Sequence, residues 1–186
     1  MKKYAAAALI TFSTLSMLSN SVNAVPMTWG ANGHEYEVIY APSTSWSIAR
    51  TQAQALGSGW DLATITSLAE QNFITSMLGP ASGALIEYYI GGVFTTEWTW
   101  VTGEIFDFTY WGAGEPNNNA GEPHIALDGR FNAGNWGWND YTGAGSGFVH
   151  GYVVEKHTIE IAEPGTLSLF GLGLLMLGLR RRYTRR

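Results

Sequence analysis

The segment from Gly103 to Glu122 constrains the fold more than any other part of this 186-residue chain. Glycine, proline and asparagine dominate it, and residues 114–124 read GEPNNNAGEPH. These residue types favour turns and disfavour both helix and strand. An irregular segment of about 20 residues inside one domain is unusual unless it has a function. The sequence therefore predicts a long functional loop that something must order.

The first 24 residues have the pattern of a signal peptide. Two lysines precede an apolar run from Ala5 to Leu18, and the segment ends at Ala24 with the small residues of a signal-peptidase site. We expect cleavage after Ala24 and export of the remaining chain. An uncleaved membrane anchor is the alternative.

Residues 161–186 have the pattern of a second targeting segment. Glu163 and Pro164 precede 15 uncharged residues, 165–179, and five arginines follow these. A helix of this length rises about 22 Å, which is short against a hydrocarbon core of about 30 Å. Basic residues after an apolar segment are typical of a cytoplasmic stop. The pattern predicts a short C-terminal transmembrane helix that anchors an exported domain.

Between these two ends the chain is strongly acidic. Arg50, Arg130 and Lys156 are the only lysine and arginine residues between residues 25 and 163, where all 15 acidic residues lie. Such a domain repels nucleic acid and anionic lipid and is suited to bind cations. The alternative is that the acidic residues serve only to keep the domain soluble. The chain contains no cysteine, so the exported domain must be stable without disulfides.

Residues 25–160 predict a single α+β domain. Two early helices are expected, with Trp46, Ala49, Ala53 and Leu56 facing inward on the first and Ala69, Phe73 and Met77 on the second. A capping box from Ser67 to Glu70 opens the second helix. Short strands are expected in HEYEVIY, DLATI, YYIGGVF, EWTWV, HIALDG, NWGWND and FVHGYVVE.

Oxygen-bearing side chains gather in and near the long loop, at Glu115, Asn117, Glu122, Asn139 and Asp140. Calcium takes about six to eight oxygen ligands from carboxylates, amides and carbonyls in flexible geometry. A cis bond before Pro116 would turn the side chains on either side of it toward one ion. The residues thus favour a calcium site, and ordinary polar loop residues are the alternative.

From Gly33 to Glu155 the chain resembles a C-type lectin-like domain. The motifs that carry the resemblance are GHEYEVI, LATITSLAEQNF, YIGG, WTWVTGE, YWGAGEPN, WND and the closing GYVVE. The resemblance implies an α+β fold with two helices, short antiparallel sheets and a long calcium-binding loop. The family's two disulfides are missing, since Ala53 and Val154 stand at one cysteine pair and His124 at half of the other.

The resemblance also implies one calcium site, formed in this chain by Glu115, Asn117, Glu122, Asn139 and Asp140. In the family the ion binds two adjacent sugar hydroxyls, while the ligand carboxylates accept hydrogen bonds from them and the amides donate. The EPN motif implies mannose, glucose, N-acetylglucosamine or fucose. Glu122 comes slightly early, which leaves Asp128 and Glu104 as alternative ligands. We expect no auxiliary calcium site, because Asn118 stands where that site favours aspartate.

The aromatic and histidine residues admit further hypotheses. Tyr141 is predicted to be exposed and to stack on the sugar, whereas Trp98, Trp100 and Trp111 are expected in the core. The four histidines do not have the spacing of a zinc site, and no nucleophile elbow is present. The sequence therefore predicts neither a histidine metal site nor an enzyme.

Residues 161–186 resemble the bacterial PEP-CTERM sorting tail, although Ala162 replaces the first proline of its motif. The resemblance implies cleavage by an exosortase, passage through the inner membrane, and a final place on the cell surface or in the extracellular matrix of a Gram-negative bacterium. The whole sequence predicts an exported, calcium-dependent carbohydrate-binding module whose glycan is an exopolysaccharide or a cell-surface glycan. The alternative is a surface structural or adhesive protein that binds protein.

Overall fold

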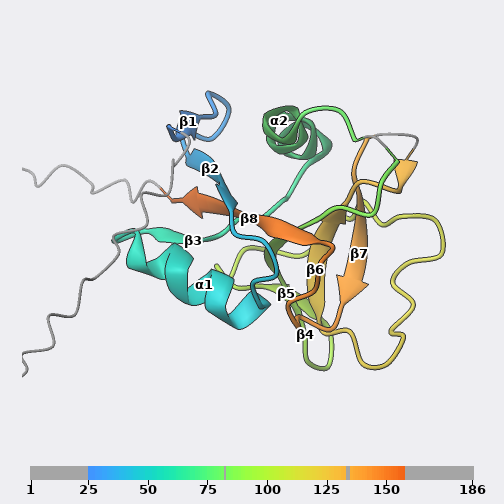
Figure 1. Cartoon of the computed structure of the whole chain (residues 1–186). Coiled ribbons are helices and arrows are strands. Elements are labelled where there is room, and N and C mark those ends of the chain that lie inside the picture. The colour runs from blue at the N-terminus through green and yellow to red at the C-terminus, as the bar shows by residue number, and fades with distance from the viewer. Residues whose placement is uncertain (1–24, 82, 133–134, 158–186) are drawn as a thin grey trace, which may run out of the picture.

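A computed structural model describes residues 25–81, 83–132 and 135–157 (Figure 1). The predicted signal peptide and the predicted sorting tail, with its apolar segment 165–179, lie outside these residues. None of the helices in the described ranges has the length and apolar character needed to cross a membrane.

Two helices and eight strands make up the described part of the domain. They are β1 (Met27–Thr28), β2 (Glu35–Tyr40), α1 (Trp46–Ala55), β3 (Trp60–Leu62), α2 (Leu68–Leu78), β4 (Glu87–Phe94), β5 (Trp98–Trp100), β6 (His124–Asp128), β7 (Gly137–Tyr141) and β8 (Val149–Lys156). The α+β prediction is confirmed.

The strands form one mixed sheet rather than separate antiparallel sheets. Its order is β1-β2-β8-β4-β6-β7, while β3 pairs with β8 and β5 pairs with β4. The pairing of β4 with β8 is parallel, and the other pairings are antiparallel. The central strand β8 thus connects the half of the sheet that holds β2 and β3 to the half that holds β6 and β7.

Each face of the sheet is covered by a helix. Side chains alternate along a strand, so in β8 Val153 enters one buried cluster with Ile74 of α2, whereas Val154 enters the other with Ala49 and Ala53 of α1. In Figure 1, α1 and α2 lie on opposite sides of the sheet, and the long loop projects beyond β6 and β7. The loop is therefore carried at one end of a core that is closed on both faces.

The first helix begins where the sequence indicates. Ser45 caps α1 by accepting a hydrogen bond from the backbone N–H of Ile48, and Trp46, Ala49 and Ala53 are buried as predicted. The prediction for Leu56 is wrong, because this residue caps the helix C-terminus and is 40% exposed.

The inward face of α2 differs from the prediction. Ser67 caps the helix by accepting from Glu70 N, as the capping box indicates, but Ala69 is exposed while Glu70 and Gln71 are buried. Gln71 has partners in the interior: its Nε2 donates to the Trp136 carbonyl at 2.9 Å and its Oε1 accepts from Trp138 Nε1 at 2.8 Å. A polar side chain is tolerated inside when its hydrogen bonds are satisfied.

Packed side chains occupy the positions at which the resemblance places cysteines. Ala53 and Val154 lie fully buried in the same apolar cluster. The His124 ring stacks on Trp46 with centroids 4.2 Å apart, and it lies so close to Gly143 that a side chain there would collide with it. Burial lowers the pKa of His124 to about 4, so the imidazole is neutral at pH 7 and acts as a packing group.

Candidate functional site

The irregular segment between β5 and β6 folds back along β7. The backbone N–H of Gly112 donates to the Trp138 carbonyl, and the N–H of Trp138 donates to the Tyr110 carbonyl, both at 2.8 Å. Phe106 and Trp111 pack on the Trp138 ring at centroid distances of 6.1 and 5.6 Å. The first half of the loop is therefore ordered by aromatic packing, and this packing brings Glu115 to the end of β7.

Asp140 fastens the next turn of the loop. Its side chain is 1% exposed, and its Oδ1 and Oδ2 accept from the backbone N–H groups of Asn117 at 3.0 Å and Asn118 at 2.6 Å. The Glu115–Pro116 bond is cis. Asn117 Nδ2 donates to Glu115 Oε2 at 2.5 Å, and Asn118 Oδ1 accepts from Glu122 N at 3.2 Å. The two glutamates are thus tied through asparagines to one turn above Asp140.

We call Glu115, Glu122 and Asp140 the loop cluster. Their carboxylates lie close enough to repel one another. The pKa of Glu115 is raised to about 7, first by burial and then by its hydrogen bond and charge repulsion with Asp140. The pKa of Glu122 is raised by burial and by Asp140. The ion pairs among the described residues involve none of these three carboxylates. Within the described chain the loop cluster therefore has no basic side chain in ion-pair contact with it.

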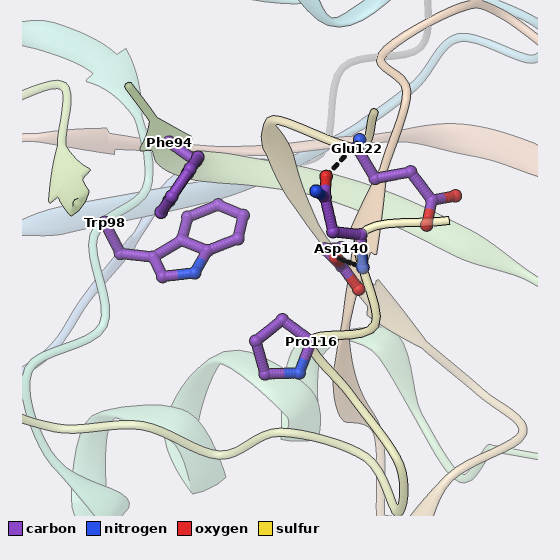
Figure 2. Close-up of a pocket in the computed structure, with 6 residues that line it drawn as sticks. Phe94, Trp98, Pro116, Glu122 and Asp140 are labelled. Carbon is purple, nitrogen blue, oxygen red and sulfur yellow. Dashed lines mark hydrogen bonds between the residues drawn. The ribbon is translucent and has the colours of Figure 1, made fainter. Parts of the chain in front are cut away.

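A pocket of about 170 Å³ opens beside the loop cluster (Figure 2), lined by Phe94, Trp98, Pro116, Asn118, Glu122 and Asp140. Phe94 and Trp98 are cross-strand partners in the β4–β5 hairpin, so they share a face, and their rings lie 5.2 Å apart. Trp98 was expected in the core but is only half-buried, as is Trp111, whereas Trp100 is 3% exposed as predicted. The pocket has an aromatic wall and a carboxylate wall.

The sequence did not lead us to predict this aromatic wall, although it contains a usable signal. Phe94 and Trp98 flank the short Thr-Thr-Glu turn of a hairpin, and residues that face each other across such a turn lie on the same side.

Asn139 does not join the other predicted ligands. Its backbone pairs with Ala126 and that of Asp140 with Ile125, so their side chains leave opposite faces of β7. Asn139 Nδ2 donates to Glu87 Oε1 at 3.1 Å, and both side chains are buried. Burial, followed by the charge of Asp128, raises the pKa of Glu87 to about 7. The structure places the Asn139 amide in a buried pair instead of at the loop cluster.

Tyr141 lies on the same face as Asn139 and is half-buried, contrary to the expectation of an exposed ring. It packs against Tyr89 with centroids 6.0 Å apart and does not line the pocket. The alternation of side chains along β7 therefore separates Tyr141 from Asp140.

The two alternative ligands also lie elsewhere. Asp128 is buried and pairs with Arg130, and Glu104 accepts a hydrogen bond from Thr102 at 3.2 Å. Neither residue lines the pocket beside the loop cluster.

The loop cluster fits calcium in its chemistry. Three carboxylates and the Asn117 amide supply hard oxygen donors, and repulsion among the carboxylates favours a divalent cation between them. Asn139, as oriented, does not contribute to this set.

Comparisons with known proteins agree with the fold. Ladderlectin of Oncorhynchus mykiss is 30% identical over 146 residues, which cover 76% of this chain and 74% of ladderlectin. The galactose-specific lectin nattectin of Thalassophryne nattereri is 29% identical over 109 residues, which cover 57% of this chain and 67% of nattectin. The herring type II antifreeze protein has a similar structure, with a TM-score of 0.55, 25% identity, and coverage of 68% of this chain and 93% of its own.

No family model matches the chain. The matched proteins are lectins and an antifreeze protein, and the chain is accordingly not an enzyme, as predicted. Because the ladderlectin match extends over about three quarters of both chains and the structure has the same fold as its neighbours, the protein belongs to the C-type lectin-like domain family.

Proposed function

We propose that this protein is an exported lectin that binds carbohydrate in a calcium-dependent manner at the loop cluster. The observation that carries the proposal is the convergence of Glu115 and Glu122 on Asp140, beside a pocket that Glu122 and Asp140 line on one side and two aromatic rings line on the other. Relatives that are lectins support it.

One Ca²⁺ would be held by Glu115, Asn117, Glu122 and Asp140, and it would supply positions for two adjacent sugar hydroxyls. In this chain the glutamates would accept hydrogen bonds from those hydroxyls, and Asn117 Nδ2 would donate. Asn139 would take its expected place as a second donor only by leaving Glu87, which is buried and bonded to it. We retain the prediction of a single calcium site without an auxiliary one.

We assign the apolar surface for the sugar to Trp98 and Phe94 rather than to Tyr141. They form the wall opposite Glu122 and Asp140 (Figure 2), whereas Tyr141 packs on the other face of β7. The C–H face of a pyranose would pack on these rings while its hydroxyls face the carboxylates.

The EPN sequence at residues 115–117 favours a mannose, glucose, N-acetylglucosamine or fucose type of glycan. Nattectin is a galactose-specific relative, so galactose is the informative competitor in any test. One shallow pocket offers little buried area, and useful avidity would come from several copies in an array.

From its two terminal segments we infer that the protein is exported by a Gram-negative bacterium. An exosortase would process residues 161–186 at the inner membrane, and the domain would reach the cell surface or extracellular matrix. An exopolysaccharide or surface glycan is the natural ligand there. The acidic charge of the domain argues against nucleic acid as a partner.

The test is a glycan array probed with the protein in calcium and again in chelator. Binding to mannose-type glycans in calcium, lost in chelator and in Asp140→Asn and Glu122→Gln, is the expected result. Asp107→Asn is the matched control, because this exposed carboxylate lies in the same loop outside the pocket. Equal glycan binding by Asp140→Asn and wild type would overturn the site.

A surface structural or adhesive protein that binds protein is the second candidate. Two observations favour it: an antifreeze protein shares the fold, and the Asn139 amide lies away from the loop cluster. A folded wild-type protein that binds no glycan with calcium present would select this function.

A further inference from the structure

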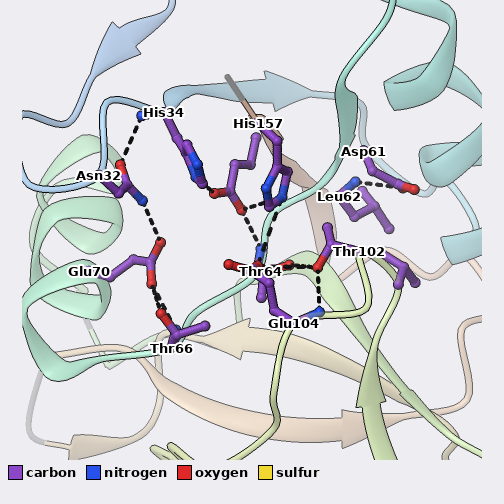
Figure 3. Close-up of polar contacts among 12 residues, drawn as sticks. Asn32, His34, Asp61, Leu62, Thr64, Thr66, Glu70, Thr102, Glu104 and His157 are labelled. Carbon is purple, nitrogen blue, oxygen red and sulfur yellow. Dashed lines mark hydrogen bonds and ion pairs between the residues drawn. The ribbon is translucent and has the colours of Figure 1, made fainter. Parts of the chain in front are cut away.

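Two histidines and two glutamates come together away from the loop cluster, near the end of β8. His34 precedes β2, Glu155 lies in β8 and His157 follows it, while Glu104 comes from the beginning of the loop (Figure 3). We propose that His34, Glu155 and His157, which we call the strand cluster, bind one zinc ion together with Glu104.

The strand register brings the residues together. Tyr36 pairs with Glu155 across antiparallel strands, and side chains two residues apart share a face. His34 therefore lies on the same side of β2 as Tyr36, and His157 on the same side of β8 as Glu155. The backbone N–H of His157 donates to the Gly59 carbonyl at 3.0 Å, which fixes the end of β8. Backbone pairing thus fixes Glu155 and the strand ends that carry His34 and His157, whereas Glu104 comes from the loop.

The distances suit a small ion. His34 Nδ1 lies 2.6 Å from Glu155 Oε1, and His157 Nε2 lies 3.7 Å from Glu155 Oε2 and 3.8 Å from Glu104 Oε2. One ligand atom from each member of the strand cluster falls within 4.8 Å of the others. Tetrahedral zinc with bonds of about 2.0–2.2 Å separates its ligand atoms by about 3.3–3.6 Å, so small shifts would complete the site.

The strand cluster also contains a buried polar atom whose hydrogen-bonding capacity is not satisfied. Among the described residues, the buried Nε2 of His157 has no hydrogen-bond partner, although two carboxylates lie nearby. The Glu155 side chain is 1% exposed, and burial raises its pKa. It already accepts from Tyr36 Oη at 2.9 Å and Thr64 N at 2.9 Å, which hold its two oxygens in place. A cation would balance this buried carboxylate and use the open lone pair of His157.

The ligand chemistry selects the metal. Two imidazole nitrogens with two carboxylate oxygens suit zinc, whereas calcium prefers oxygen alone. Four protein ligands make a closed structural site, which would join the end of β8 to the segment before β2 and to the start of the long loop. The chain has no cysteine, so such a metal would take the place of a covalent tie.

The experiment is a zinc titration of untagged, chelator-treated protein by calorimetry in two buffers of different ionisation enthalpy. We expect one zinc per chain, a higher melting temperature, and proton release as the proton between His34 and Glu155 is displaced. Calcium in excess should not displace the zinc.

Variants separate this site from other metal binding. His157→Gln should weaken zinc binding by about tenfold or more, because it removes a ligand. His150→Gln is the matched control, since this histidine lies at the other end of β8 from Glu155 and packs against Tyr40 and Tyr88. Asp140→Asn should also bind zinc normally.

Glu104→Gln provides a second test if His157→Gln does not fold, because Glu104 lies in the loop outside the sheet pairing. Weaker zinc binding by this variant supports the site. A folded wild-type protein without zinc binding, or unchanged affinity in the folded ligand variants, would overturn the proposal.

Discussion

The loop cluster and the strand cluster are held by different kinds of backbone. Asp140 orders the loop cluster through hydrogen bonds to two loop N–H groups, and the two glutamates lie on irregular chain. Glu155 of the strand cluster lies in a central strand paired with both β2 and β3, and its side chain is 1% exposed. An irregular loop can adjust to a large ion with many oxygen ligands, whereas paired strands fix few ligands closely. The domain thus separates a proposed ligand-binding region from a proposed structural one.

The largest expected effect comes from Trp138, which supports the loop region. Trp138→Ala should lower the free energy of unfolding by about 3–5 kcal/mol, because the ring is fully buried beneath the loop aromatics. Urea denaturation measures the change. Trp138→Phe should cost less, since it keeps an aromatic ring but leaves Gln71 Oε1 without its donor. Equal stability of the alanine variant and wild type would show that the loop is ordered by something else.

Glu87→Gln tests the face of β7 that turns away from the loop cluster. It should stabilise the protein by about 1–2 kcal/mol at pH 8, because it removes a buried charge and keeps the acceptor for Asn139. The pKa of Glu87 is about 7 in the fold, above its ordinary value of 4.5, so its ionisation costs stability as pH rises between these values. The gain should therefore vanish at pH 4. Denaturation at both pH values checks the sign, and a destabilised variant at pH 8 would contradict it.

The pH dependence of calcium binding tests the loop cluster. Calcium needs ionised carboxylates, and Glu115 has a pKa of about 7, so calcium affinity should fall by about tenfold from pH 8 to pH 6. Without calcium the sign is opposite: the proton binds the folded state more tightly, so the contribution of Glu115 to stability falls as pH rises from about 4.5 to about 7. Calorimetric titration measures the affinity. Glu115→Gln should bind calcium more weakly and lose most of this pH dependence, and an unchanged profile would remove Glu115 from the site.

The smallest effect is expected beside the strand cluster. Glu35 Oε1 accepts from Lys156 Nζ at 3.2 Å, and both side chains are about one-third exposed. Glu35→Gln should change the free energy of unfolding by less than about 0.5 kcal/mol, because exposed ion pairs contribute little. It should leave zinc binding intact, since Glu35 points away from His34 and Tyr36. A large loss of zinc affinity would mean that the strand cluster extends across β2.

Some of these features could be predicted because local residue chemistry specifies them. The capping residues Ser45 and Ser67 begin the two helices, and the glycine, proline and asparagine run produces the irregular loop. The buried positions of Trp46, Ala49 and Ala53 follow from helical spacing. The error at Ala69 arose because buried polar residues, Glu70 and Gln71, found partners that lie far away in the sequence.

The candidate site could be predicted only in part. The motif residues Glu115, Glu122 and Asp140 come together, since the loop returns to the end of β7. Asn139 and Tyr141 do not join them, because the alternation of a regular strand turns neighbouring side chains to opposite faces. Spacing along the chain does not reveal that alternation until the register of β7 against β6 is known.

The sequence by itself determined the family motifs, the helix starts and the long oxygen-rich loop, because these depend on residue type and short-range spacing. The tertiary structure alone decided that Phe94 and Trp98 face the carboxylates, that Asn139 is buried with Glu87, and that His34 meets His157. These contacts depend on which strands pair and in what register, and that is set by burial of the whole sheet between two helices.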